Sequence, residues 1–194
     1  MCSACDDDYD TEDSWYDDYP EYSEADLGGR SEFVEVDRLR NELSYITTHP
    51  ERWNQGDWVT ALNDELKFAP QPPTACGTMG CLAGNAVVHA DGDLHWEKGE
   101  WYDYTTGKYK PYWKTEFVTM PGAEDKEHIE TAARDLLGLT SEQADYLFAA
   151  ENDLDDLWRL AEIISDGKIT AEDRAKAEAE RERIKAETAE AHAE

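Results

Sequence analysis

Two cysteines, Cys76 and Cys81, stand in a glycine-rich run that leads into a stretch of small and apolar residues. Such a stretch predicts a helix that begins near residues 78–80, with Cys81 in its first turn. Unpaired N–H groups and the helix dipole lower the pKa of a thiol in that position, and a nearby base can activate it further. The candidate bases are His49, His89 and His95. The first candidate chemistry is therefore that of a cysteine nucleophile.

The same thiols are candidate metal ligands, because structural zinc sites take four ligands from cysteine and histidine. Two ligand sets are open: all four cysteines, Cys2, Cys5, Cys76 and Cys81, or Cys76 and Cys81 completed by His49 or His89. A third interpretation needs no chemistry, because small buried cysteines also pack well against a helix. We adopt this third interpretation, and we expect no catalytic residue, no metal and no cofactor.

Gly84 indicates that another part of the chain lies close to the predicted helix. Glycine inside a helix costs about 1 kcal/mol relative to alanine, so its presence needs a reason. We expect a backbone segment or an aromatic ring, such as that of Trp53 or Trp58, to lie against the face formed by Cys81, Gly84 and Asn85. The candidate binding residues are Cys76, Cys81, His49, Trp58, Gly84 and Asn85.

The elements around this centre predict an α+β fold, mostly helical, in a single domain with a small antiparallel β-meander. Apolar residues at three- and four-residue steps predict a helix over residues 33–47, and it should stop before Pro50. Alternating aromatic and β-branched residues over 94–120 predict the meander. Helices return after residue 122, where Gly138 is a helix stop and Thr140 to Gln143 form a capping box.

The net charge of −28 divides the chain into three parts. Residues 1–30 hold 11 acids and one arginine, and we expect a disordered acidic tail there. Residues 31–169 form the globular domain, and residues 170–194 form a solvated helical extension. Aromatic residues alternate with the acids of the tail at Tyr9, Trp15, Tyr16, Tyr19 and Tyr22. Alternation of this kind suits docking on a basic surface with apolar groups.

The acidity also limits the class of partner. A strongly negative protein repels nucleic-acid phosphates and anionic lipids, so we expect neither direct nucleic-acid binding nor membrane binding. The acidic N-terminus lacks the apolar core of a signal peptide, and no stretch approaches the roughly 20 apolar residues of a membrane span. We therefore expect a cytoplasmic protein whose partner is a basic protein; its oligomeric state is open.

The chain also resembles a family of small proteins from actinobacteria and their bacteriophages for which no activity is established. The resemblance spans roughly residues 34–165. It rests on His49-Pro-Glu51, Gln55 with Trp58, Cys76-Gly-Thr78, Cys81-x-Ala-Gly84, Ala133-x-x-Leu-Leu-Gly-Leu139 and Leu147-Phe148. The chain departs from the family at Asn85, where its members mostly carry tryptophan. The resemblance implies a phage or actinobacterial origin and groups the two cysteines with His49 in one structural centre.

From these features we expect a non-enzymatic cytoplasmic binding protein. A phage accessory factor that engages a basic host protein, with surface carboxylates that imitate nucleic-acid phosphates, fits the charge and the implied origin. The alternative from another class is a thiol enzyme or a zinc-binding domain that uses Cys76 and Cys81.

Overall fold

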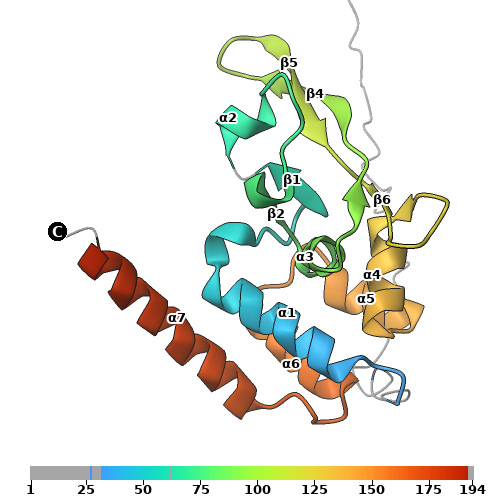
Figure 1. Ribbon diagram of the computed structural model, residues 1–194, viewed down its shortest axis with the longest axis vertical. Helices are drawn as coiled ribbons and strands as arrows, with labels where there is room; N and C mark the ends of the chain where they lie inside the picture. Colours follow the sequence, from blue (N-terminus) through green and yellow to red (C-terminus); the bar gives the residue numbers. More distant parts are fainter. Residues whose placement is uncertain (1–26, 28–31, 62, 192–194) are drawn as a thin grey trace, which may run out of the picture.

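The computed structural model describes Leu27, residues 32–61 and residues 63–191 (Figure 1). The helices in these residues are α1 (Val36–Thr48), α2 (Asp64–Lys67), α3 (Leu82–His89), α4 (Ile129–Leu137), α5 (Ser141–Phe148), α6 (Leu154–Ile164) and α7 (Ala171–Ala191), with the short 3-10 helices η2 (Pro50–Arg52) and η3 (Ala75–Gly77). The strands are β1 (Val59–Ala61), β2 (Thr78–Gly80), β3 (Asp93–Leu94), β4 (Glu97–Asp103), β5 (Lys108–Lys114), β6 (Phe117–Thr119) and β7 (Glu127–His128). The predicted α+β class is confirmed.

Helix α3 lies at the centre of the fold and packs against α1, α4 and α5. It is buried from Leu82 through Val87, because small and apolar residues occupy all of its faces. Neighbouring helices supply amphipathic faces around it, and their buried residues form one hydrophobic core with α3. No helix in the described residues is long and apolar enough to cross a bilayer.

The predicted helix ends around α3 are confirmed. Helix α1 stops at Thr48, before Pro50. Gly138 ends α4 in the left-handed conformation, with φ of 65°. The capping box between Thr140 and Gln143 is present in both directions at the start of α5.

The expected single meander is wrong in its topology. The strands form three separate antiparallel groups, β1–β2, β3–β6–β7 and the β4–β5 hairpin. The outer half of β5, from Lys108 to Pro111, is exposed, and only its last residues are partly buried. Because that half has no apolar face in contact with the core, the hairpin projects from the body instead of joining the β3–β6 pair (Figure 1).

The expected helical extension at the C-terminus is confirmed as α7, which also packs against the body. Its first half lies along α1, and Ala177 is its one buried residue in the described part. Asp173 pairs with Arg40 of α1, and Arg174 pairs with Asp155 of α6. The rest of the helix extends away from the domain (Figure 1).

The expected boundary of the acidic tail at residue 30 is wrong at Leu27. This side chain is 2% exposed and belongs to the core, and its carbonyl oxygen accepts a hydrogen bond of 2.6 Å from Nε2 of Gln143. A lone leucine between acids and glycines shows no periodicity, so its burial could not be predicted from the pattern of apolar residues. Residues 1–26 and 28–31, the rest of the predicted tail, lie outside the described residues.

We predict that deletion of residues 1–26 leaves the free energy of unfolding within about 0.5 kcal/mol of wild type, whereas deletion of residues 1–30 lowers it by about 2–3 kcal/mol. The larger loss comes from the Leu27 side chain and from the Gln143 amide, which loses its acceptor. Urea unfolding followed by tryptophan fluorescence measures both. Equal stability of the two truncated proteins would contradict the role of Leu27.

Candidate functional site

The predicted close approach of another segment to Gly84 is confirmed, and that segment is the backbone at Trp58. Strand β1 pairs with β2 in the register Val59↔Gly80, which places Trp58 against the first turns of α3. A Cβ at Gly84 would overlap the carbonyl oxygen of Trp58, and it would lie 2.7 Å from the carbonyl carbon and 2.8 Å from Cγ2 of Val59. The expected aromatic ring lies elsewhere: the Trp58 indole makes edge contacts with His128 at 5.4 Å and Phe148 at 6.4 Å between ring centroids.

Cys81 is the N-cap of α3, one residue before its first turn. Its Sγ accepts a hydrogen bond of 3.4 Å from the backbone N–H of Gly84 and lies 3.8 Å from the Trp58 carbonyl oxygen, to which it donates. The residue is 1% exposed. Burial raises the pKa of the Cys81 thiol to about 12, although the N–H groups of the helix start oppose the shift. The pKa is raised and not lowered as a cysteine nucleophile would need, because desolvation exceeds the effect of the helix terminus.

Asn85 holds the strand and the helix start together. Its Nδ2 lies 2.8 Å from the carbonyl oxygen of Gly80, 3.1 Å from that of Cys81 and 3.4 Å from that of Arg52. The side chain is buried, so these bonds satisfy carbonyl groups that water cannot reach. A tryptophan at this position, with a single N–H donor, could not form these bonds together.

Gln55 is a second buried amide that joins distant segments. Its Oε1 accepts from Nε1 of Trp53 at 3.1 Å and from the backbone N–H of Leu82 at 3.3 Å. Its Nε2 donates to the carbonyl oxygens of Leu147 and Ala149 at 3.3 and 3.2 Å. The side chain therefore links the loop before β1 to the start of α3 and to the end of α5. The sequence drew attention to Gln55 through the resemblance but gave no indication of these partners.

Cys76 lies apart from the buried thiol, on the surface in η3. Its carbonyl oxygen, and not its thiol, takes part in the centre: Nη1 of Arg52 donates to it and, at 3.1 Å, to the carbonyl oxygen of Thr78. Arg52 was not among the predicted residues, although it fixes the loop that carries Cys76.

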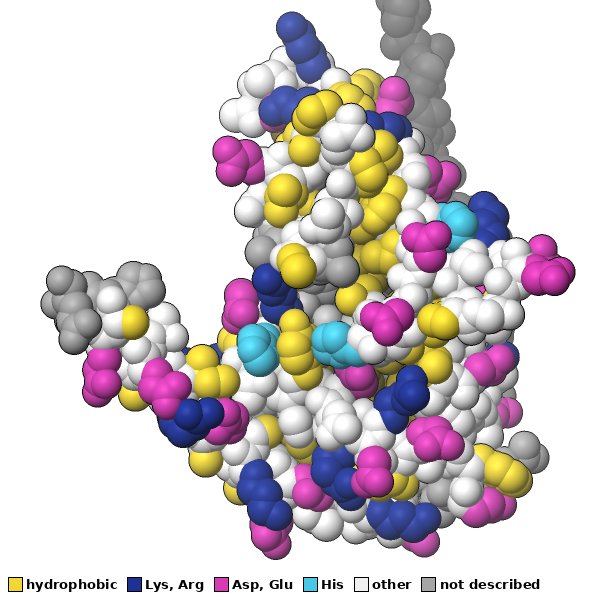
Figure 2. Space-filling model, viewed as in Figure 1, with side chains coloured by type: hydrophobic (Ala, Val, Ile, Leu, Met, Phe, Trp, Pro, Cys, Tyr) yellow, Lys and Arg dark blue, Asp and Glu magenta, His cyan; other side chains and the backbone are white. Residues whose placement is uncertain are grey.

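His49 lies in a cluster of rings between α1 and α3. Its ring stacks on Tyr45 with centroids 4.6 Å apart, and its Nδ1 lies 3.2 Å from the Tyr45 carbonyl oxygen. The edge of His89 meets the other side of Tyr45 at 4.2 Å, and its Nδ1 lies 2.7 Å from Oε2 of the buried Glu42. Figure 2 shows two histidines on either side of a hydrophobic side chain on this face. Burial raises the pKa of the Tyr45 phenol, and the Arg52 guanidinium opposes that shift.

The residues around the start of α3 connect segments of the backbone to one another. Cys81, Gly84 and Asn85 lie together with the backbone of Trp58, and the Cys81 thiol and the Asn85 amide nitrogen form hydrogen bonds with backbone atoms. Cys76 and His49 lie on the adjoining loops. Among the described residues, no group of three or more His, Cys, Asp or Glu side chains is placed to hold a metal ion. Cys2 and Cys5 lie outside the described residues.

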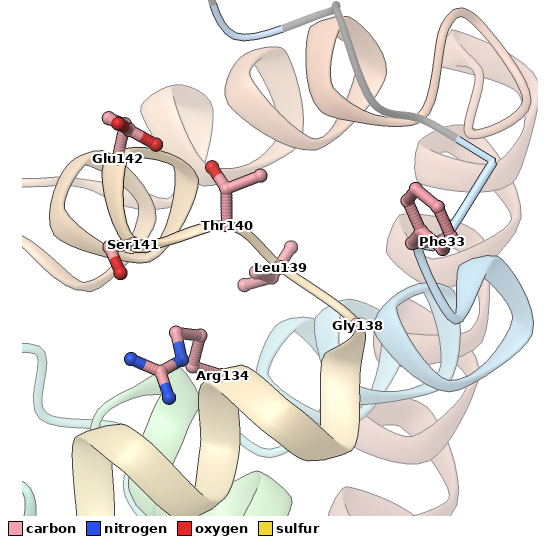
Figure 3. Close-up of a pocket in the computed structure, with 7 residues that line it drawn as sticks. All are labelled: Phe33, Arg134, Gly138, Leu139, Thr140, Ser141 and Glu142. Atoms are coloured by element: carbon pink, nitrogen blue, oxygen red, sulfur yellow. The ribbon is translucent and has the colours of Figure 1, made fainter.

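An open pocket of about 450 Å³ lies where α4 meets α5 (Figure 3). Its lining consists of Phe33, Arg134, Gly138, Leu139, Thr140, Ser141 and Glu142. The guanidinium of Arg134 donates from Nε and Nη2 to Oδ1 of Asp135, and the hydroxyl of Thr140 caps α5. Because these polar groups already have partners, the pocket offers a ligand little beyond the exposed ring of Phe33.

Comparison of the chain with protein-family models, with curated proteins and with solved structures gave no match. We therefore infer function from the geometry and charge of this chain.

We predict that Gly84→Ala lowers the free energy of unfolding by about 3 kcal/mol or more. The new methyl group cannot fit without separating β1 from α3, and this cost exceeds the gain of about 1 kcal/mol in helix propensity. Urea unfolding measures the change.

Gly56→Ala is the matched control. A Cβ at Gly56 would meet only Oδ1 of Asn54, at the ordinary distance of 3.5 Å, so we expect a change within about 0.5 kcal/mol. A Gly84→Ala protein as stable as wild type would show that the contact with Trp58 is not tight.

Proposed function

We propose that the protein is a non-enzymatic binding protein that engages a basic protein partner. A phage or actinobacterial accessory factor is the role that fits the family resemblance, and the carboxylates of such a factor can occupy sites where a basic host protein otherwise holds phosphates. The proposal includes no cofactor, no membrane contact and no direct contact with nucleic acid.

One observation carries the proposal: the segment from α5 through the end of α6 holds a large excess of carboxylates, of which Asp155 pairs with Arg174 and Asp156 with Arg159. Eight acids lie between residues 142 and 166, and Arg159 is the one base among them. All but Asp156 are exposed. The eight are Glu142, Asp145, Glu151, Asp153, Asp155, Asp156, Glu162 and Asp166.

Surface carboxylates of this kind act mainly on association. They attract a basic partner over distances of about a Debye length, roughly 10 Å at 0.1 M salt, and they repel acidic competitors. They therefore favour a fast and salt-sensitive encounter with cationic proteins. The same field works against nucleic acid, whose phosphates have the same sign.

The thiol alternative lacks a supporting observation of this kind. Cys81 is buried and its pKa is raised to about 12, so almost none of it is thiolate near neutral pH. Cys76 is exposed, and among the described residues no hydrogen bond joins its thiol to a base that could activate it.

We predict that the immobilised protein captures basic proteins from an actinobacterial lysate at about 0.05 M salt and loses most of them at about 0.5 M salt. Triple charge reversal by Asp145→Lys, Glu151→Lys and Glu162→Lys should abolish the capture, because it removes attraction and adds repulsion on the same segment. Mass spectrometry of the captured proteins measures both effects.

The control reverses three exposed acids elsewhere, by Glu124→Lys, Asp125→Lys and Glu190→Lys, and changes the net charge by the same amount. Capture should survive in the control. Equal loss in both variants would mean that only net charge matters, and capture that is equally empty at both salt concentrations would refute the proposal.

A further inference from the structure

Exposed aromatic side chains gather on the β4–β5 hairpin. Of the four large hydrophobic residues that are exposed in the described part of the chain, three are hairpin tyrosines: Tyr102 at 37%, Tyr104 at 88% and Tyr109 at 66%. Tyr102 lies 4.9 Å from Tyr104 and 5.0 Å from Tyr109 between ring centroids, so the three rings form one patch. Exposed tyrosines in one patch are typical of binding surfaces.

Lysines without counter-ions lie along the hairpin, with Lys108 next to the patch and Lys67 and Lys98 beside Tyr112 and Trp113. Over the described residues, Lys67, Lys98 and Lys108 have no carboxylate within ion-pair distance, whereas Lys110 pairs with Asp103. Lys67 and Lys98 lie over the rings of Tyr112 and Trp113, at 5.1 and 3.7 Å from the centroids. Strand β5 holds three lysines and no acid. The hairpin and α2 together hold five lysines and five acids, so in a chain of net charge −28 this surface is close to neutral and is aromatic.

The projection of the hairpin makes the surface accessible. Figure 1 places β4, β5 and α2 at the end of the molecule that lies farthest from α6. Figure 2 shows hydrophobic side chains gathered on this projecting part, with Lys and Arg side chains around its end.

We infer that this surface, formed by the tyrosine patch with Lys67, Lys98 and Lys108, is the docking site of residues 1–26 of the same chain. That segment holds 11 acids and neither lysine nor arginine, so its charge complements the unpaired lysines. Its five aromatic residues, Tyr9, Trp15, Tyr16, Tyr19 and Tyr22, suit the exposed rings. Aromatic side chains on both partners add stacking to the ion pairs.

The segment is long enough to reach the hairpin. It joins the domain at Leu27, whose carbonyl oxygen accepts a hydrogen bond from Gln143 at the start of α5. Twenty-six residues span at most about 85 Å when extended. A domain of this size has a radius of gyration of about 15 Å, so every part of its surface lies within reach.

Tethering favours this occupant over other acidic chains. A segment attached to the domain has an effective concentration on the order of millimolar at its own surface, which a free acidic partner rarely attains. The acids of α5 and α6 repel the segment and so direct it toward the lysines. A second copy paired along the edge of β4 is disfavoured, because an antiparallel pairing centred on Glu100 would place two like charges opposite each other.

The test uses paramagnetic relaxation in the full chain. A nitroxide is attached at Ser14→Cys in a background with Cys2, Cys5 and Cys76 changed to serine, while the buried Cys81 is retained. We expect amide signals of residues 102–110 to lose most of their intensity and those of residues 180–190 to keep theirs. About 0.5 M salt should restore the hairpin signals.

Lys108→Glu should lower the docked population about ten-fold, because an attraction becomes a repulsion. Tyr104→Ser, at a side chain that is 88% exposed, should lower it without a change of charge. Lys185→Glu on α7 is the charge-matched control and should have no effect. Uniform broadening, broadening strongest away from the hairpin, or broadening that appears only as protein concentration rises would overturn the inference. The experiment contains no partner, so its failure would leave the proposed function intact.

Discussion

The contact between the Trp58 carbonyl group and α3 is the constraint on which the rest of the structure depends. It requires glycine at position 84, because a Cβ there would occupy the place of the carbonyl oxygen. The close approach sets the register of β1 against β2 and brings the loop that carries Gln55 over the start of α3. Once the two segments lie this close, buried carbonyl and N–H groups need partners, and Asn85, Gln55 and the Cys81 thiol provide them.

The sequence predicted the main helices and the location of this centre but not its internal contacts, and residues 78–80, which we expected to begin the helix, form β2 instead. Apolar periodicity and capping residues were enough for α1, for the end of α4 and for the start of α5, and Gly84 alone indicated a close neighbour. Local sequence places Cys81 near a helix start, but the sign of its pKa shift depends on the distant segment that covers it. The partners of Gln55 lie 92 and 94 residues away, and no spacing rule reaches that far. Leu27 and the separation of the hairpin from the β3–β6 pair are likewise decided by tertiary packing.

The buried polar groups and the exposed charged groups have different partners. The two buried thiol and amide groups of the centre face backbone atoms, whereas carboxylates dominate the exposed α5–α6 segment and unpaired lysines gather beside the hairpin tyrosines. We propose that the acidic segments engage a basic partner and the hairpin of the same chain. We also propose that the cysteine centre holds the domain together and that Cys81 does not act as a nucleophile.

The most direct measurement of this central claim is the alkylation rate of Cys81 in a protein whose other cysteines, Cys2, Cys5 and Cys76, are serine. A buried thiol whose pKa is raised to about 12 should react only when the protein unfolds. We therefore predict that the rate is very slow in the native protein and rises with urea in proportion to the unfolded fraction. Fast alkylation near neutral pH that does not change with urea would show an accessible, activated thiol and would contradict the account.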